Sequence, residues 1–300
     1  MIAVIGASGN TGRVVAETLL AQGEKVRAIG RDTSRLASLV QRGAVSYAAN
    51  VTHAAELAKA FEGAEGVYVM LPPDPAAADV PAYQSAVSDA LASAIQKAKV
   101  PYALALSSIG ADKPDRTGPV VGLHELEQKL SGISGLNAVY LRAGYFMENL
   151  LPQAQVIRGF GKAVGPLRAD LKVPMIATRD IGARAASILH KRDFTGKQAR
   201  ELHGQRDLDY REATAVIGRA IDKPDLEYAQ LPDAQLRPAL IQMGMSASMA
   251  NLLLEMAEAL NSGYMKPLEP RSAENTTPTP IETFVAEKFA SLFTGKGANA

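Results

Sequence analysis

Short apolar runs alternate with longer amphipathic segments along the first half of the chain. Continuous apolar runs are typical of strands buried on both faces, and apolar residues spaced by three or four are typical of helices. The pattern predicts strands at residues 2–5, 25–30, 44–49, 65–71, 102–108 and 136–142. It predicts helices between them. The first follows the glycine-rich segment at 6–12 and ends near Gly23, and the others lie at 33–41, 54–61, 79–99 and 123–130. Strands alternating with helices predict right-handed crossovers, and therefore an α/β fold with a doubly wound parallel sheet.

The pattern changes after residue 150. Here it predicts a strand and a helix within 173–190, with Thr178 or Asp180 as the helix cap. The remaining predicted elements are a strand at 199–204, a helix at 210–220, a helical stretch at 236–260, a polar loop at 269–280, a helix at 281–293 and a frayed tail at 294–300. The stretch at 236–260 is rich in methionine, which we expect in the core, with a role in lining a substrate pocket as the alternative. We expect a sheet domain at 1–150 and a smaller, interleaved C-terminal substrate or cap region at 151–300.

Composition narrows the classes of function. The net charge of +1 gives no electrostatic argument for binding nucleic acid or an anionic membrane. The absence of cysteine excludes disulfides and thiol nucleophiles, and the four histidines lack the spacing of metal ligands. No apolar run approaches the roughly 20 residues of a membrane span, and the first strand follows Met1 without a signal peptide. We expect a cytoplasmic protein without a metal, and a homodimer or a protein partner is left open.

The segment that joins the first strand to the first helix has the sequence GASGNTG, with three glycines three residues apart. Glycine allows a tight turn and a close approach to a pyrophosphate, and the first turn of a helix offers unpaired N–H groups. The spacing differs from the common G-x-G-x-x-G fingerprint. The alternative is a structural turn without a ligand. The residues that we expect to hold the pyrophosphate of a dinucleotide are Gly6, Ser8, Gly9, Asn10, Thr11 and Gly12.

Arg31 follows the second strand, at the place where an acidic residue would bind the ribose diol of NAD(H). A guanidinium can instead pair with a 2′-phosphate, so we expect NADP(H) as the cofactor. The alternative for Arg31 is a solvated surface arginine. Asp32 is expected to cap the helix that begins at Thr33, with ribose binding as the alternative.

Two later strands also end in residues suited to a nucleotide. Leu71 and Pro72 begin a stiff loop after the fourth strand, which could lie along the ribose next to the nicotinamide. Ser107 and Ser108 end the fifth strand, where the nicotinamide is expected. Both serines have the alternative of a turn or capping role.

Residues 141–149, LRAGYFMEN, follow the sixth predicted strand. Together with the glycine turn, Arg31 and LSSIGA at 106–111, they make the chain resemble the NmrA-like group of atypical short-chain dehydrogenases/reductases. That group has a G-x-x-G-x-x-G turn, a basic residue after the second strand and an LRPGxFMEN-like segment after the sixth. Ala143 here replaces the frequent proline. Residues 174–186 and 244–256 also resemble segments of the group.

The resemblance implies an NADP-binding Rossmann-type α/β domain with a smaller α/β region that covers the strand ends. It implies that the glycine turn holds the pyrophosphate and that Arg31 binds the 2′-phosphate. The further residues that it implies are Asn50 and Val51 at the adenine, Leu71 and Pro72 at the ribose, and Ser107, Tyr145, Phe146 and Asn149 at the nicotinamide and substrate. Many relatives have an aspartate near the position of Asn50, which makes its adenine contact a departure from the pattern.

The proton donor is the weakest part of the sequence pattern. Short-chain dehydrogenases usually use a tyrosine with a lysine four residues later, and none of the nine tyrosines here has that lysine. Where some relatives have a lysine before the sixth strand, this chain has Leu123 or His124. His124 and Tyr145 are therefore the candidate catalytic residues, because an imidazole can protonate an oxyanion near neutral pH. The alternative for His124 is a half-exposed helix residue without a role, and Glu127 is expected to orient its imidazole or to be solvated.

We expect an NADPH-dependent oxidoreductase that transfers hydride to a quinone or a similar small apolar acceptor. The alternative is a non-catalytic NADP(H)-binding sensor, which the missing tyrosine–lysine pair favours. A third class, an NADP-linked epimerase or isomerase, shares the same cofactor motifs.

Overall fold

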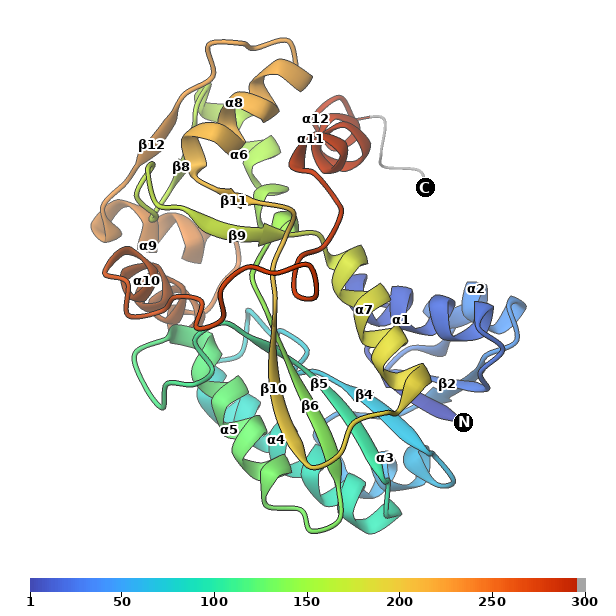
Figure 1. Cartoon of the computed structure of the whole chain (residues 1–300). Coiled ribbons are helices and arrows are strands. Elements are labelled where there is room, and N and C mark those ends of the chain that lie inside the picture. Colours follow the sequence, from blue (N-terminus) through green and yellow to red (C-terminus); the bar gives the residue numbers. More distant parts are fainter. Residues whose placement is uncertain (296–300) are drawn as a thin grey trace.

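The computed structural model describes residues 1–295, and a parallel sheet forms its centre (Figure 1). The sheet has seven strands in the order β10-β6-β5-β4-β1-β2-β3, and all neighbours are parallel. The strands are β1 (Ile2–Ile5), β2 (Val26–Gly30), β3 (Val45–Ala48), β4 (Gly66–Val69), β5 (Tyr102–Ser108), β6 (Asn137–Ala143) and β10 (Lys197–Leu202). The chain reverses direction across the sheet between β1 and β4, which is where such sheets bind ligands.

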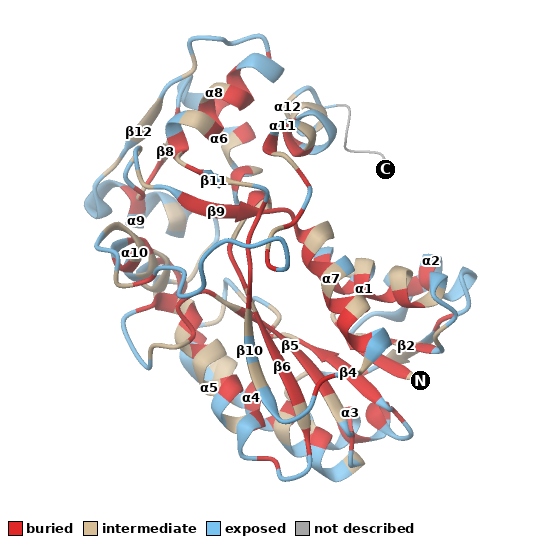
Figure 2. Ribbon diagram, viewed as in Figure 1, coloured by how far each residue is buried: buried red, intermediate tan, exposed pale blue. Residues whose placement is uncertain are grey.

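Helices cover both faces of this sheet. They are α1 (Asn10–Ala21), α2 (Ala37–Gln41) and α7 (Thr178–Lys191) on one face, and α3 (Ala54–Phe61), α4 (Val80–Ala98) and α5 (Val121–Ser131) on the other (Figure 1). Each face has its own apolar core, and the central strands are buried along most of their length (Figure 2). Burial on both faces explains why these strands are continuous apolar runs in the sequence. The predicted doubly wound α/β fold is confirmed.

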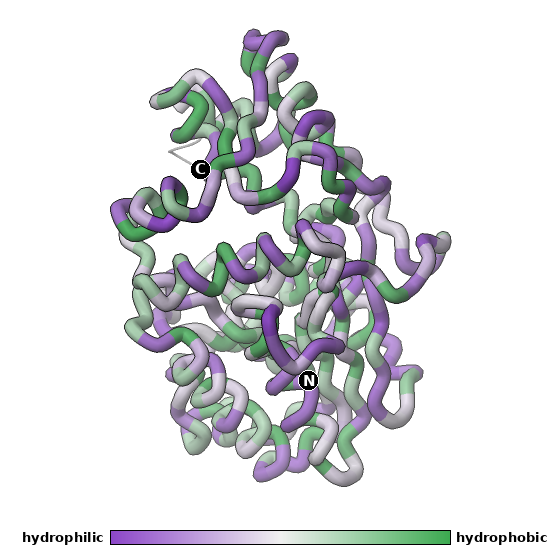
Figure 3. The backbone as a smooth tube through the Cα atoms, turned by 90° about the vertical axis from the view of Figure 1, so that its left-hand side faces the viewer, coloured by the Kyte–Doolittle hydropathy of each residue, from purple (hydrophilic) through white to green (hydrophobic). Residues whose placement is uncertain are grey.

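A smaller part lies over the carboxyl ends of the strands and has an apolar core of its own (Figure 1). It contains two small sheets, ordered β11-β9-β7 and β12-β8. Its elements are β7 (Tyr145–Phe146), η3 (Met147–Leu150), α6 (Gln153–Phe160), β8 (Ala163–Gly165), β9 (Val173–Ile176), β11 (Asp207–Leu208), α8 (Tyr210–Ala220), β12 (Tyr228–Gln230), α9 (Asp233–Gln242), α10 (Ala247–Asn261), α11 (Ile281–Phe284), η4 (Val285–Phe289) and α12 (Ala290–Phe293). Hydrophobic and hydrophilic residues alternate around the helices of both parts (Figure 3).

Two elements after residue 150 return to the large sheet. Helix α7 packs against α1, and β10 pairs with β6 at the edge of the sheet. The region after residue 150 therefore contributes to both parts of the molecule, and the boundary at residue 150 stays a prediction. Within residues 1–295, no helix is long and apolar enough to cross a membrane.

Three local predictions need correction or completion. The stretch at 236–260 is two helices, because Gly244 with φ +94° ends the first and the hydroxyl of Ser246 caps the second. The stretch at 33–41 begins as the 3-10 helix η1 (Thr33–Leu36). Of the tail predicted at 294–300, residues 296–300 lie outside the described part of the chain.

The cap predicted for α7 is wrong. Thr178 and Asp180 lie inside the helix, and Ala177 occupies the capping position. The carboxylate of Glu148 accepts hydrogen bonds from the backbone N–H of Thr178, at 3.1 Å to each oxygen, and from its hydroxyl at 2.5 Å. Because the capping group comes from 30 residues earlier in the chain, the local sequence could not indicate it.

Candidate functional site

The glycine turn between β1 and α1 is tight enough to require glycine. Gly6 has φ +65°, a conformation that favours glycine, and its carbonyl oxygen accepts a hydrogen bond from the N–H of Gly9 at 2.8 Å. A Cβ on Gly12 would lie 2.3 Å from the carbonyl oxygen of Gly6. The turn thus brings the start of α1 directly against the end of β1.

The first turn of α1 is open to an anion. The capping position, Gly9, has no side chain to accept the free N–H groups, and the first turn contains no acidic residue. Asn10 is exposed and Ser8 is half-buried, whereas Thr11 is buried and its hydroxyl accepts a hydrogen bond from Tyr68 at 2.8 Å. The unpaired N–H groups of this first turn, the positive end of the helix dipole and the absence of side chains on the glycines suit a pyrophosphate.

We expect Gly12→Ala to destabilise the protein by about 1–3 kcal/mol, the usual cost of overpacking a close contact. The methyl group would meet backbone atoms of Gly6, which cannot move aside like a flexible side chain. The measurement is urea unfolding with and without NADPH, and the increase in stability on adding NADPH is expected to shrink. Gly159→Ala is the matched control, because nothing lies within 4 Å of its added Cβ. Equal stability of the two variants would contradict the prediction.

Arg31 and Asp32 have different surroundings at the end of β2. Asp32 caps η1, since its carboxylate accepts hydrogen bonds from the N–H and hydroxyl of Ser34 at 2.9 and 2.7 Å. The predicted capping role is confirmed. Arg31 is exposed and makes no hydrogen bond or ion pair with any of residues 1–295. Its guanidinium is available to a ligand at this edge.

The residues implied at the adenine and ribose also lie just after the carboxyl ends of the parallel strands. The side-chain oxygen of Asn50 accepts hydrogen bonds from the N–H and hydroxyl of Thr52, at 3.1 and 3.0 Å, so it forms a local turn. Val51 is half-buried against the core beside α3. Leu71 is buried and Pro72 half-buried. Their contacts with a nucleotide stay predictions.

Ser107 and Ser108 point to different partners. Ser107 is 3% exposed and its hydroxyl donates to the carboxylate of Glu127 at 2.6 Å. The same carboxylate accepts two hydrogen bonds from Arg142, at 3.0 and 2.6 Å. Glu127 is therefore neither solvated nor bound to His124, and both expectations for it are wrong. Successive residues of β5 face opposite sides of the sheet, so only Ser108 of the two lines the pocket described next.

A pocket of about 130 Å³ lies where β5 and β6 end. Ser108 and Tyr145 line it from the strand ends, and Met256, Leu260 and Met265 line it from α10 and the segment after it. Most of its surface is apolar, as a flat aromatic molecule would require. The sequence predicted Ser108 and Tyr145 as site residues and left a pocket role open for Met256. Leu260 and Met265 were missed because only the fold brings them to these strand ends.

Three predicted residues do not line this pocket. His124 is half-buried on α5, and its Nδ1 lies 2.8 Å from the carbonyl oxygen of Ala111, to which it donates. Phe146 packs against the core of the large sheet, and Asn149 is exposed on η3. Their functional roles stay predictions. Among residues 1–295, no group of three His, Cys, Asp or Glu side chains could hold a metal ion.

Tyr145 is the tyrosine that lines the pocket. Its hydroxyl lies 2.9 Å from that of Tyr210, and the Tyr210 ring packs against Tyr228 with centroids 4.5 Å apart. Burial raises the pKa of Tyr145 above its usual value, while a hydrogen bond with Tyr210 acts in the opposite direction. Burial likewise raises the pKa of Tyr210 well above its usual value. Both phenols therefore keep their protons at neutral pH and can donate hydrogen bonds.

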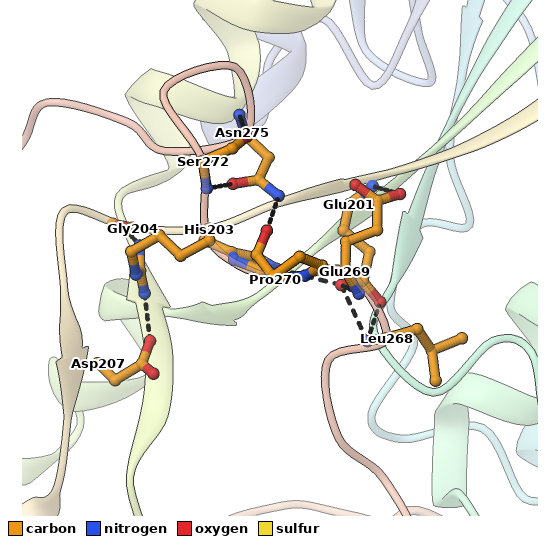
Figure 4. A network of polar contacts seen from close by, with 10 residues as sticks. Glu201, His203, Gly204, Asp207, Leu268, Glu269, Pro270, Ser272 and Asn275 are labelled. Atoms are coloured by element: carbon orange, nitrogen blue, oxygen red, sulfur yellow. Dashed lines mark hydrogen bonds and ion pairs between the residues drawn. The ribbon is translucent and has the colours of Figure 1, made fainter.

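The segment after α10 is attached to the end of β10, and we call residues 265–277 the strap. The buried carboxylate of Glu201 accepts hydrogen bonds from the N–H groups of Leu268 and Glu269, both at 2.9 Å (Figure 4). Burial acts to raise the pKa of Glu201, but hydrogen bonds from His203 and these amides outweigh it, and the pKa lies below its usual value. The anionic carboxylate thus holds the strap beside the pocket.

Further contacts hold the rest of the strap. The N–H of His203 donates to the carbonyl oxygen of Asn275 at 2.6 Å, and the N–H of Thr277 donates to His203 at 3.0 Å. Arg271 donates to the carbonyl oxygen of Gly204 and forms an ion pair with Asp207 (Figure 4). The loop predicted at 269–280 is therefore an ordered structural element.

The glycine turn, Arg31 and the pocket share one edge of the sheet. Arg31 follows β2, the turn follows β1, and the pocket lies at the ends of β5 and β6. Three strand spacings of about 4.8 Å separate β2 from β5, which places Arg31 and Ser108 about 14 Å apart along the edge. An extended dinucleotide can span such a distance.

The chain is similar to known proteins over most of its length. The model of the NmrA-like family matches residues 1–292. The chain is 29% identical over 269 residues to the NAD(P)H azoreductase of Xenophilus azovorans, covering 88% of this chain and 89% of that protein. It is 25% identical over 268 residues to quinone oxidoreductase 2 of Escherichia coli, with 88% and 89% covered.

A solved structure of similar fold is that of the NADPH-dependent quinone oxidoreductase QOR2 of Escherichia coli complexed with NADPH. It superposes with a TM-score of 0.82 at 23% identity, covering 96% of this chain and 99% of that one.

Proposed function

This chain belongs to the NmrA-like family, and on that premise we propose that it is an NAD(P)H-dependent oxidoreductase acting on a quinone or a similar small apolar acceptor. The azoreductase and quinone oxidoreductase relatives support this class of reaction. We further propose NADPH as the preferred donor, because Arg31 is free to pair with a 2′-phosphate.

The observation that supports the proposal best is the order of groups along the sheet edge. An exposed arginine, an open helix N-terminus and an apolar pocket follow one another across β2, β1 and β5. These groups suit a 2′-phosphate, a pyrophosphate and a flat ring. They follow one another in the same order as these parts do along NADPH and its acceptor. When bound, the nicotinamide supplies a hydride.

The chain's own residues would position the acceptor and stabilise the charge that develops on it. Met256, Leu260 and Met265 offer an apolar surface that excludes water from the ring. Tyr145 keeps its proton because burial raises its pKa, so its hydroxyl can donate a hydrogen bond to an oxyanion. Tyr210 can donate to Tyr145 in turn, which would stabilise the phenol as it gives up its proton.

The direct test is a titration of the purified protein with NADPH and NADH, followed by addition of a quinone and an azo compound to the same sample. The proposal expects tight NADPH binding and loss of NADPH absorbance on adding an acceptor. Tight binding without turnover of either acceptor would contradict it and support the sensor hypothesis. Absence of NADPH binding would contradict both.

We expect Tyr145→Phe to lower kcat for a quinone about tenfold. General acid catalysis usually contributes more, roughly 100-fold or above, but the oxyanion of a reduced quinone is a weak base that water can protonate. Tyr210→Phe is the matched comparison, because it breaks the hydrogen bond between the two hydroxyls but leaves the Tyr145 hydroxyl itself in place. Its loss of kcat is therefore expected to be smaller. The measurement is steady-state kinetics at saturating NADPH. A Tyr145→Phe variant that keeps the kcat of the unaltered protein would contradict the prediction.

A further inference from the structure

Two lysines and no acidic side chain of the described residues line the pocket. Lys172 and Lys266 line it, and within residues 1–295 no Asp, Glu or His side chain does. The remainder of the lining is apolar or backbone, apart from Ser108 and Tyr145. An apolar pocket with cationic groups suits a molecule that has an aromatic body and an anionic substituent.

The two lysines differ in how far their charge is already balanced. Lys266 is exposed and makes no hydrogen bond or ion pair with any of residues 1–295. The ammonium of Lys172 lies 3.9 Å from carboxylate oxygens of both Asp209 and Glu212, at the outer limit of an ion pair. Lys266 is therefore the freer charge, and Lys172 is partly neutralised by its neighbours.

The fold holds the backbone of Lys266 in place on both sides. Before it, the N–H of Met265 donates to the carbonyl oxygen of Ala259 at 2.9 Å, and the Met265 side chain is buried against the turn at Gly110. After it, Leu268 and Glu269 are hydrogen-bonded to the buried carboxylate of Glu201 (Figure 4). The strap thus fixes the backbone of Lys266 at a defined place beside the apolar pocket.

We infer that the acceptor of this enzyme is an aromatic molecule with a carboxylate or sulfonate group, and that Lys266 selects for that group. This inference rests on the proposed function, since it concerns the acceptor of the same site. The ring lies against Met256, Leu260 and Met265, and the anionic group lies toward Lys266. Lys172 contributes less, because Asp209 and Glu212 compete for its charge.

Equilibrium binding tests the inference without requiring turnover. The probes are naphthalene-2-sulfonate and the neutral naphthalene-2-sulfonamide, which have nearly the same shape. With NADP⁺ present, the sulfonate is expected to bind about two- to fivefold more tightly, the range of an exposed charge pair. The preference should decline as salt is added, because salt screens the charge. Equal affinities for the two probes would overturn the inference.

Three variants test which lysine causes the preference for the sulfonate over the sulfonamide. Lys266→Gln is expected to remove most of the preference, by weakening sulfonate binding more than sulfonamide binding, and Lys172→Gln should have a smaller effect. Lys97→Gln is the matched control, since it removes the same charge from the exposed carboxyl end of α4, which precedes the start of β5 at the opposite edge of the sheet. Equal loss of both probes in Lys266→Gln would overturn the inference.

Two further readouts separate this inference from the proposed function. Reduction of neutral 1,4-naphthoquinone by the unaltered protein tests the proposed function alone. In Lys266→Gln, kcat/KM for 1,4-naphthoquinone-2-sulfonate is expected to fall about two- to fivefold relative to kcat/KM for the neutral quinone, mainly through KM. A weaker Kd for NADPH in Lys266→Gln, with the probe preference unchanged, would assign the lysine to the cofactor and overturn the inference.

Discussion

Glu127→Leu is expected to lower the free energy of unfolding by about 3–5 kcal/mol, because it leaves a buried guanidinium without its partner. The Glu127 side chain is 5% exposed and that of Arg142 is 13% exposed. Two hydrogen bonds join them, and Ser107 donates a third to the same carboxylate. Leucine would remove all three acceptor contacts while the charge of Arg142 remains inside the protein.

Urea unfolding measures this effect, and Glu125→Leu is the matched control on the same helix. Glu125 binds Lys129 at 2.7 Å, but its side chain is 36% exposed, so its loss should cost about 1 kcal/mol or less. The double variant Glu127→Leu/Arg142→Met should recover most of the lost stability, since an apolar pair can replace a buried ion pair. A Glu127→Leu variant no less stable than Glu125→Leu would contradict the prediction.

Arg31→Ala is expected to weaken NADPH binding by about 1.5–3 kcal/mol, the contribution of hydrogen bonds to a charged group. This corresponds to a loss of roughly 10- to 150-fold in Kd. NADH lacks the 2′-phosphate, so its affinity should change little. The exposed guanidinium makes no hydrogen bond or ion pair with residues 1–295, so its loss is expected to leave the fold intact.

Fluorescence titration with both nucleotides measures the change in specificity. Arg42→Ala is the matched control, because Arg42 is an exposed arginine of the same βαβ unit, 3.7 Å from Glu17 in an ion pair. It should leave both affinities unchanged. Equal losses for NADPH and NADH in Arg31→Ala, or no loss, would show that Arg31 does not bind the 2′-phosphate.

Much of the large sheet could be predicted from the sequence because its signals are local. Strands buried on both faces are continuous apolar runs, and the six strands predicted up to residue 142 are all present. Asp79 at the start of α4 and Asp32 at the start of η1 cap the helices that follow them, so their roles depend only on the next few residues. The glycine turn and Arg31 likewise follow strands that the pattern identifies.

Two of the errors concern contacts between distant parts of the chain, and the third is a local helix break at Gly244. Glu127 was expected to be solvated or to orient His124, but β5 and β6 bring Ser107 and Arg142 to it. The cap of α7 comes from Glu148, and the methionine-rich stretch is interrupted at Gly244. Periodicity along one helix gives its apolar face and does not say which distant polar group it meets.

The sequence by itself determined the α/β class, the alternation of strands and helices up to residue 142 and the glycine turn, because these depend on periodicity and on glycine and capping residues within a few positions. Only the tertiary structure decided which residues line the pocket. Met265 and Lys266 are more than 100 residues from Tyr145, and the hydrogen bonds of Glu201 with the strap bring that segment to the strand ends. The pocket depends on long-range packing, and so its lining could not be predicted from any single segment.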